Sequence, residues 1–202
     1  MKLLDTCVIL NGPPNSGKDT LADILARDYN FNKHQMKDTL YSETAKHFQV
    51  AEDKFIELAK HRKHKEMPLM TLGGRSPREA LIYVSEDVIK VAHGKDYFGK
   101  RQAMACVQAN SKKAVFSDGG FPAEIEPLKD VFNTVYIFRL HREDCTFTSD
   151  SRDYLKGFDN TFDINIVEGA PKIAILEILR LLKTGPTRRA STRGGASSLA
   201  YG

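Results

Sequence analysis

Nine residues near the start of the chain have the composition and spacing of a loop that binds phosphate groups. Gly12 and Gly17 stand five positions apart, and Lys18 follows the second glycine directly. Glycines let successive backbone N–H groups surround phosphate oxygens, and a lysine in this place neutralises the charge of a phosphoryl group in transfer. The stretch 12–20 therefore predicts a P-loop. The residues expected to bind ATP are Gly12, Asn15, Ser16, Gly17, Lys18, Asp19 and Thr20.

The same loop departs from the strict P-loop pattern at the residue that usually contacts Mg²⁺. Ser or Thr should follow the lysine, but Asp19 stands there and Thr20 comes one position later. Asp118 is a further candidate, because it follows the apolar run 114–116, and a strand that ends in aspartate brings a carboxylate close to Mg²⁺ in P-loop enzymes. We expect phosphates and water to supply most of the Mg²⁺ ligands, with Asp19, Thr20 and Asp118 as metal contacts of the protein.

A second anion site is indicated by arginines at a helix start. Ser76 and the proline after it begin a predicted helix, and Arg75 and Arg78 flank this point. The helix dipole disfavours cations at an N-terminus by about 0.3–1 kcal/mol each, and a bound anion would reverse that cost. We predict that Arg75 and Arg78, with Arg101, bind the monophosphate of an acceptor substrate. The competing interpretation is that they are ordinary surface arginines.

Further arginines enter a polar stretch that could close over the nucleotide. Arg139 and Arg142 lie at and beyond the end of an apolar run, and Arg152 lies within the polar segment 140–157. Closure of a lid can place guanidinium groups on a transferring phosphoryl group. The sequence leaves open which arginine does so. The predicted catalytic residues are Lys18, Asp118, Arg139 and Arg142.

Hydrophobic periodicity predicts how these residues are positioned. Short β-prone runs alternate with segments of helical periodicity, which is typical of an α/β protein with a parallel sheet. Strands are expected at 7–10, 114–116, 134–138 and 162–166. Helices are expected after the P-loop, twice within 33–67, from residue 76 with a capping box, and at 99–110, 123–131 and 171–183.

The chain of 202 residues is long enough for one such domain. We predict a kinase-type domain at 1–183, with a helical acceptor-binding region at 33–110 and the lid at 140–157. Residues 184–202 are rich in Gly and Ser and carry three arginines and no acid, so a disordered basic tail is expected.

Composition narrows the partners to small molecules. The net charge of +4 leaves the folded part almost neutral, which argues against a dedicated nucleic-acid binder. No apolar run is long enough to cross a bilayer. The cysteines, three in number and widely spaced, indicate neither a disulfide framework nor a zinc site, and so favour a reducing cytoplasm. A homodimer is compatible with the sequence.

Four strings, GKDT, SPREALIYVSEDV, KDYFG and AVFSDGGFPAE, occur in this order. These strings make the chain resemble the deoxynucleoside monophosphate kinases of tailed phages. The resemblance extends over roughly residues 3–183. The resemblance implies a P-loop NTP hydrolase fold, ATP and Mg²⁺ as co-substrates, and conversion of deoxynucleoside monophosphates to diphosphates. It also implies that Lys18 holds ATP phosphates, that Asp118 lies by the metal and that Arg78 meets the acceptor.

One position departs from that family pattern. Its members often have an arginine two residues after the strand-end aspartate, whereas Gly120 stands there in this chain. The departure implies that one substrate contact is lost or comes from elsewhere.

Two other functions stay open at this stage. Animal-type phosphomevalonate kinases also have a lysine–aspartate pair in the P-loop, although the Ser76 helix start favours the phage type. A non-catalytic nucleotide-binding module is a second alternative, against which the intact Lys18 argues. A GTPase is disfavoured because Asp118 is not followed by a D-x-x-G turn and no N-K-x-D string occurs.

Overall fold

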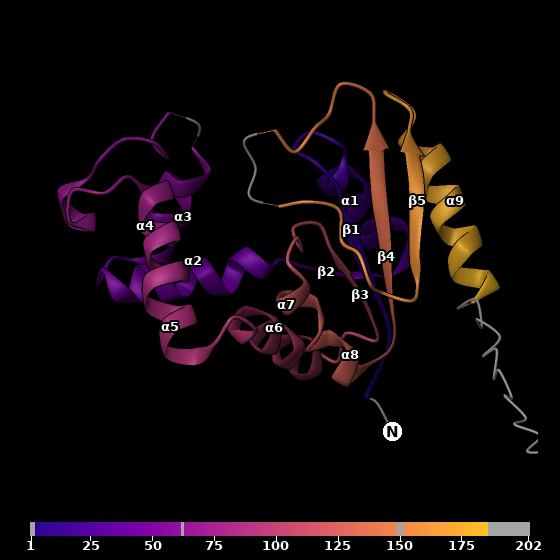
Figure 1. Ribbon diagram of the computed structural model, residues 1–202, viewed down its shortest axis with the longest axis horizontal. Helices are drawn as coiled ribbons and strands as arrows, with labels where there is room; N and C mark the ends of the chain where they lie inside the picture. The colour runs from indigo at the N-terminus through magenta and orange to yellow at the C-terminus, as the bar shows by residue number, and fades with distance from the viewer. Residues whose placement is uncertain (1–2, 62, 149–151, 186–202) are drawn as a thin grey trace, which may run out of the picture.

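The protein was described from a computed structural model, which defines residues 3–61, 63–148 and 152–185. A single sheet of five parallel strands runs in the order β2-β3-β1-β4-β5, with helices on both faces (Figure 1). The strands are β1 (Leu4–Asn11), β2 (Asn32–His34), β3 (Lys113–Phe116), β4 (Phe132–Arg142) and β5 (Thr161–Ile166). This confirms the predicted α/β fold with a parallel sheet. Most of the predicted tail lies outside the described residues.

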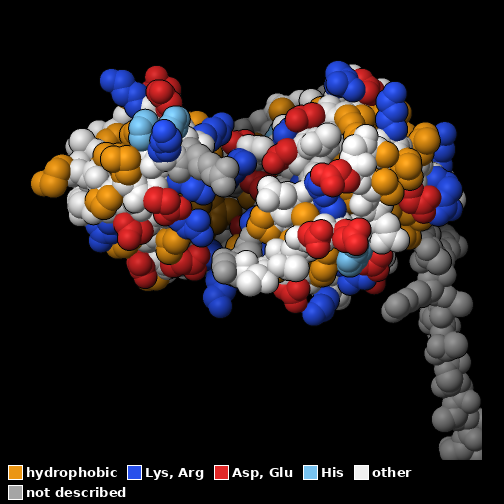
Figure 2. All heavy atoms as spheres, turned by 90° about the horizontal axis from the view of Figure 1, so that it is seen from above, with side chains coloured by type: hydrophobic (Ala, Val, Ile, Leu, Met, Phe, Trp, Pro, Cys, Tyr) orange, Lys and Arg blue, Asp and Glu red, His pale blue; other side chains and the backbone are white. Residues whose placement is uncertain are grey.

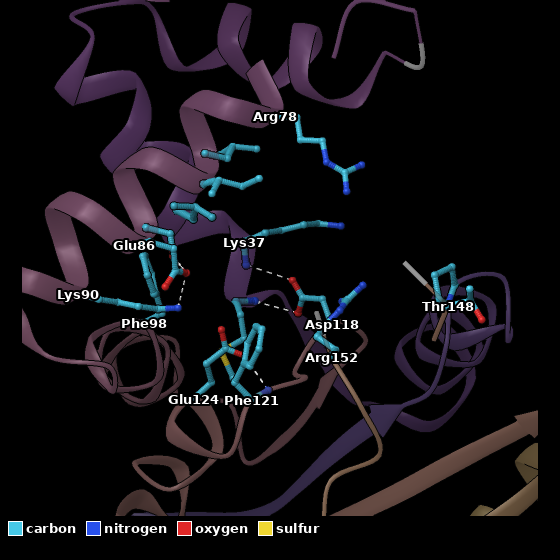
Figure 3. A pocket seen from close by; sticks show the side chains of 16 residues that line it. Lys37, Arg78, Glu86, Lys90, Phe98, Asp118, Phe121, Glu124, Thr148 and Arg152 are labelled. Carbon is cyan, nitrogen blue, oxygen red and sulfur yellow. Dashed lines mark hydrogen bonds and ion pairs between the residues drawn. The ribbon is translucent and has the colours of Figure 1, made fainter. Parts of the chain in front are cut away.

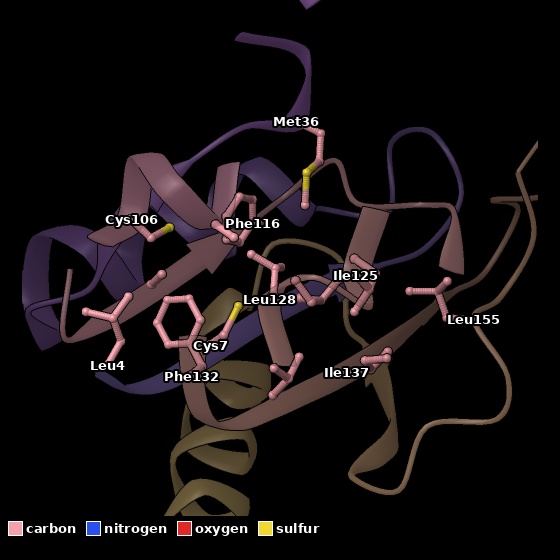
Figure 4. Packing of buried hydrophobic residues seen from close by; sticks show 14 residues of the cluster. Leu4, Cys7, Met36, Cys106, Phe116, Ile125, Leu128, Phe132, Ile137 and Leu155 are labelled. Carbon is pink, nitrogen blue, oxygen red and sulfur yellow. The ribbon is translucent and has the colours of Figure 1, made fainter. Parts of the chain in front are cut away.

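Alternation along the central strand β1 divides the core into two layers. Cys7 and Ile9 face one layer, which packs under α6 (Tyr97–Gln108), α7 (Pro122–Ile125) and α8 (Leu128–Val131), as Figure 4 shows for the cluster around Phe116. Val8 and Leu10 face the other layer. The helices that cover it are α1 (Lys18–Tyr29) and α9 (Pro171–Thr184). Burial on both faces explains why β1 reads as a continuous apolar run.

A helical lobe stands beside the sheet, on the left in Figure 1. It has its own small core around Tyr41, Phe55 and Leu72. Its elements are α2 (Met36–His47), α3 (Glu52–Lys60), η1 (Met70–Leu72), α4 (Pro77–Tyr83), the π-helix η2 (Val84–Ile89) and α5 (Lys90–His93). The two helices expected within 33–67 are therefore confirmed.

The start of α4 has the predicted capping box. The Ser76 hydroxyl accepts from the Glu79 backbone N–H (3.3 Å), and the Glu79 carboxylate accepts from the Ser76 N–H (2.8 Å). Pro77 takes the first helical position, where it has no N–H to leave unpaired. Beyond Tyr83 the backbone widens into a π-helix, which the regular periodicity of the sequence did not predict.

Other differences have local causes. Strand β2 has only three residues, half-exposed and polar, so it carries no apolar pattern. The single helix predicted at 123–131 is two four-residue helices, because Pro127 stands between them and cannot donate a backbone hydrogen bond. Strand β4 continues to Arg142, through charged residues that pair with the edge strand β5. None of the described helices is long and apolar enough to span a membrane.

Gly99 sets how closely α6 approaches α7. A Cβ at this position would lie 2.3 Å from the Glu124 carbonyl oxygen, a backbone atom that cannot rotate away. We expect Gly99→Ala to lower the free energy of unfolding by about 1–3 kcal/mol, although glycine to alanine within a helix is normally stabilising. Urea unfolding measures the change, with Lys100→Ala on the adjacent exposed residue as the control. Equal or greater stability of Gly99→Ala would contradict this packing.

Candidate active site

The P-loop follows β1 and leads into α1, as the sequence predicted. Asn15 and Gly17 have φ angles of 63° and 90°, and α1 begins at Lys18. A Cβ on Gly12 would lie 2.7 Å from the Ser16 hydroxyl and 3.0 Å from the Leu140 carbonyl oxygen. Gly12 is therefore required by close packing, and Gly17 by its left-handed backbone.

The groups in this loop fit the phosphates of ATP. The Ser16 hydroxyl is fully buried and has no hydrogen-bond partner within the described part of the chain. Buried polar atoms without a partner are rare in folded proteins, and a phosphate oxygen would satisfy this one. The Lys18 ammonium donates to the Gly12 carbonyl (2.7 Å) and the Pro13 carbonyl (2.6 Å), so its charge is held over the loop. Helix α1 adds the positive end of its dipole.

Asp19 joins α1 to the end of β3. Its carboxylate accepts from the Ser117 hydroxyl (2.7 Å) and lies 3.5 Å from the Lys33 ammonium. Partial burial acts to raise the pKa of Asp19, but the Ser117 hydrogen bond and the charges of Lys33 and Lys37 outweigh it and lower the pKa. Asp19 is thus held as a carboxylate beside the loop. Thr20 lies one position further on, exposed on α1.

Asp118 has a structural role that the sequence did not reveal. Its two carboxylate oxygens accept from the backbone N–H groups of Met36 (2.9 Å) and Lys37 (3.0 Å), at the start of α2. Burial raises the pKa of Asp118, against the lowering effect of these bonds. Each oxygen keeps a second lone pair for a water molecule or a metal ion.

The described residues contain no cluster of three or more His, Cys, Asp or Glu side chains that could hold a metal. Asp19 instead accepts from the Ser117 hydroxyl, and Asp118 follows Ser117 directly in the chain, just after β3. Two separate carboxylates suit an ion that takes most of its ligands from phosphates and water, as Mg²⁺ does. The metal contacts of Asp19, Thr20 and Asp118 stay a prediction.

A cavity of about 590 Å³ opens between the helical lobe and the sheet. Figure 2 shows the surface hollowed between these two parts. Pro14 of the P-loop borders the cavity, which extends between α2, α4, η2 and the segment after β3. The cavity therefore adjoins the predicted ATP site.

Four cationic side chains of the described residues line this cavity, and only one of them, Arg78, belongs to the predicted acceptor clamp. The other three are Lys37, Lys90 and Arg152. Figure 3 shows the charged ends of Lys37 and Arg78 pointing into the cavity on the side of Asp118. Arg75 stacks on the Tyr83 ring instead, at 4.2 Å, and neither it nor Arg101 lines the cavity. A lysine in the first turn of a helix carries no sequence signal, which is why Lys37 was missed.

The position of Arg152 explains why a glycine, Gly120, stands where the phage kinases often have an arginine. A Cβ on Gly120 would lie 2.3 Å from Cδ and 2.8 Å from Cγ of Arg152. The Arg152 side chain thus crosses the space that any side chain at position 120 would fill. Gly120 allows an arginine from the 140–157 segment to enter the cavity beside Asp118 (Figure 3).

The two strand-end arginines that were predicted to be catalytic lie in different surroundings. Arg142 donates to the Asn15 carbonyl of the P-loop (3.0 Å) and pairs with Glu168. It also lines a second cavity, of about 390 Å³. Arg139 pairs with Asp163 of β5 at 2.5 Å, and its Nε is buried without a partner among the described residues. The structure therefore brings Arg142, but not Arg139, to the loop.

Part of the predicted lid is bound to the sheet. Asn11 accepts from the Leu155 N–H (2.9 Å) and donates to the Asp153 carbonyl (3.4 Å), while the Tyr154 hydroxyl donates to the Leu140 carbonyl (2.9 Å). Leu155 itself belongs to the core. Residues 140–142 are part of β4. A lid at 140–157 stays a prediction.

Glu124 also lines the cavity, although no role was predicted for it from the sequence. Its carboxylate lies 3.4 Å from the Gly120 and Phe121 backbone N–H groups, and it lines the cavity. Burial raises the pKa of Glu124 to about 7, helped by the Asp118 charge and opposed by the N–H groups and Lys90. The sequence signal for its contact with the Phe121 N–H was the position of Glu124, three residues after the N-cap of a helix.

No protein-family model matches the chain, and no curated protein matches its sequence. A sugar kinase from a Janibacter species, solved without ligand, is similar in structure: its TM-score is 0.53 at 12% identity, over 91% of this chain and 96% of that one. A gluconokinase from Sinorhizobium meliloti has a TM-score of 0.44 at 10% identity, over 91% and 94% of the two chains, which is too low to support an argument. At this identity the likeness shows the fold alone, an α/β fold of the kinase type.

The raised pKa of Glu124 predicts a pH-dependent stability. The folded protein keeps this proton to a higher pH than the unfolded chain, so the free energy of unfolding should fall by about 2–3 kcal/mol as the pH rises from 4.5 to 7. In Glu124→Gln this fall should disappear from urea unfolding curves measured across that range. The exposed Glu126→Gln is the control and should retain it. An unchanged slope in Glu124→Gln would show that other groups cause the fall.

Proposed function

We propose that this protein transfers the γ-phosphoryl group of ATP to a deoxynucleoside monophosphate. The observation that carries the proposal is the adjacency of the P-loop to a cavity with cationic side chains in its wall. The P-loop, whose Ser16 hydroxyl has no hydrogen-bond partner among the described residues, borders through Pro14 on this cavity. One anionic substrate in each place would bring a donor and an acceptor phosphate together. The cations that line the cavity are Lys37, Arg78, Lys90 and Arg152.

The chemistry that such a site must perform is mainly electrostatic. An oxygen of the acceptor's phosphate attacks the γ-phosphorus of ATP, the bond to the bridging oxygen breaks, and ADP leaves with that oxygen. A phosphate monoester is largely ionised at pH 7, with a second pKa of about 6, so no side chain has to remove a proton. The protein's task is to align two anions and to neutralise their charge.

The residues divide between the two substrates. Backbone N–H groups of the P-loop, the Ser16 hydroxyl and Lys18 would hold the ATP phosphates, and Arg142 lies against the same loop. Bound Mg²⁺ would supply charge neutralisation at the phosphates, with Asp19 and Asp118 as the nearby carboxylates. For Arg139 to act as a catalytic residue, it would first have to break its ion pair with Asp163.

The acceptor's identity rests on the cavity and on the sequence resemblance together. A volume of about 590 Å³ lies within the range of small-ligand sites. The Ser76–Arg78 helix start and the segment from Asp118 to Glu124, which carry the resemblance to phage deoxynucleoside monophosphate kinases, both contribute residues to its walls. Similarity in fold to a sugar kinase does not favour a different acceptor, since fold and substrate are separable.

An acceptor panel tests the function directly. ADP release should be measured with ATP and Mg²⁺ and each of the four deoxynucleoside monophosphates, with phosphomevalonate and gluconate as the competing acceptors. We expect turnover that depends on a deoxynucleoside monophosphate and is lost in Lys18→Ala. Turnover with phosphomevalonate or gluconate alone would replace the proposed substrate. ATP binding without turnover on any acceptor would support the non-catalytic module.

The contact between Gly120 and Arg152 gives a second test. Gly120→Ala would push the Arg152 side chain out of its place, and Arg152→Ala would remove it. Loss of one charge-assisted contact to a phosphate should raise the acceptor's KM about tenfold in either variant, with the KM for ATP unchanged. The exposed Arg27→Ala is the control.

The double variant separates this cause from general damage to the site. If Gly120→Ala acts by displacing Arg152, the two changes together should cost no more than either alone. If the two increases in the acceptor's KM multiply in the double variant, position 120 and Arg152 act independently.

A further inference from the structure

The side of the cavity away from the charged ends of Lys37 and Arg78 carries a different set of side chains (Figure 3). In Figure 3 Glu86, Lys90 and Phe98 lie together on the side opposite Lys37 and Arg78. The Lys90 ammonium donates to Oε1 of Glu86 (2.5 Å), and the Ser85 hydroxyl donates to the same oxygen (3.0 Å). The pair thus presents an acceptor, Oε2 of Glu86, beside a charged donor with further N–H bonds to give.

The π-helix places these groups in the cavity. Leu81 and Ile82 of α4 line it, and so do Ser85 and Glu86 in η2 and Lys90 just after it. The wider turn of a π-helix shifts the residues beyond it around the axis, and such turns occur frequently at functional sites. One side of the segment is therefore directed at the cavity from Leu81 to Lys90, and its polar residues, Ser85, Glu86 and Lys90, lie in the second half.

This pair differs from an ordinary surface ion pair. Glu86 is 53% exposed, but the Lys90 side chain is only 18% exposed, and its ammonium lies 5.3 Å from the centre of the Phe121 ring. Lys90 also acts on the buried Glu124 carboxyl from across the cavity wall. The lysine is thus held between two carboxyl groups and an aromatic ring, rather than extended into water.

The walls around the pair suit a flat ring. Phe121 lines the cavity beside Lys90, and the apolar side chains of Leu40 and Phe98 line it near the same end. An aromatic ring prefers to stack on another planar group. Polar groups at the edge of such a space would then contact the rim of the bound ring.

We infer that Glu86 and Lys90 select the acceptor's nucleobase by hydrogen bonding to its edge, with Phe121 against its face. The inference rests on the proposed function. Oε2 of Glu86 would accept from an N–H of the base, and Lys90 would donate to the neighbouring carbonyl oxygen or ring nitrogen. The phosphate would then lie at the opposite end, near Lys37 and Arg78, so one ligand would span the cavity.

The experiment compares base preference in the full-length enzyme. The values of kcat/KM for all four deoxynucleoside monophosphates should be measured for the wild type, Glu86→Gln and Lys90→Met. We expect the ratio between the best and the worst acceptor to fall at least tenfold in both variants, chiefly through KM, with the KM for ATP unchanged. A glutamine side chain offers both a donor and an acceptor, so it cannot discriminate between base edges as a carboxylate does.

Two exposed residues outside the cavity provide matched controls. Asp87→Asn removes the adjacent exposed carboxylate, and Lys100→Met removes an exposed lysine of α6; neither residue lines the cavity. Both controls should keep the wild-type ratio. Equilibrium binding of each monophosphate without ATP provides a readout besides turnover and should show the same loss of preference.

The possible outcomes separate this inference from the proposed function. A wild type that phosphorylates no deoxynucleoside monophosphate overturns the proposed function. A wild type that is active, but keeps its base ratio in Glu86→Gln and Lys90→Met, overturns the inference alone. An equal rise in KM for all four acceptors also overturns it, because the pair would then support the shape of the site without reading the base.

Discussion

The Asp118 carboxylate connects the two halves of the site. Asp118 follows β3, next to the central strand that leads into the P-loop, and its two oxygens accept the first free N–H groups of α2. Among the described residues, the Gln35 side chain at the N-cap position makes no capping hydrogen bond to α2. Hydrogen bonds to a charged group contribute about 1.5–3 kcal/mol each, and the helix dipole adds to them. The helical lobe is thereby anchored at the end of the sheet where the P-loop lies.

The arrangement of charge in the cavity follows from that anchor. The N-terminus of α2 lies against Asp118, so Lys37 in its first turn points into the space beside the P-loop. Helix α4 packs against α2, and its Arg78 faces the same space. Burial raises the pKa of the Asp118 and Glu124 carboxyls, which line the same cavity as these cations. Backbone N–H groups donate to both carboxyls. Lys37 and Arg78 face the space in which we propose that the acceptor's phosphate binds.

Glycines decide how closely the remaining parts approach. Gly12 lets the P-loop pass against Leu140, Gly99 lets α6 lie on the backbone of α7, and Gly120 lets Arg152 cross the segment after β3. Each is a place where a methyl group would meet another atom at 3.0 Å or less. The binding site is therefore assembled by close contacts between segments that lie far apart in the chain.

The amino-acid sequence by itself determined the parts whose signal is local. The P-loop from Gly12 to Thr20, the capped helix after Ser76 and the strand that ends at Asp118 all follow from residue type and spacing within about ten positions. The alternation of apolar runs was enough to predict the parallel α/β sheet. Only the tertiary structure decided that Asp118 caps α2, that Arg75 stacks on Tyr83 while Arg78 faces the cavity, and that Arg152 occupies the space over Gly120. These are contacts between distant segments, and their geometry depends on packing that no local periodicity encodes.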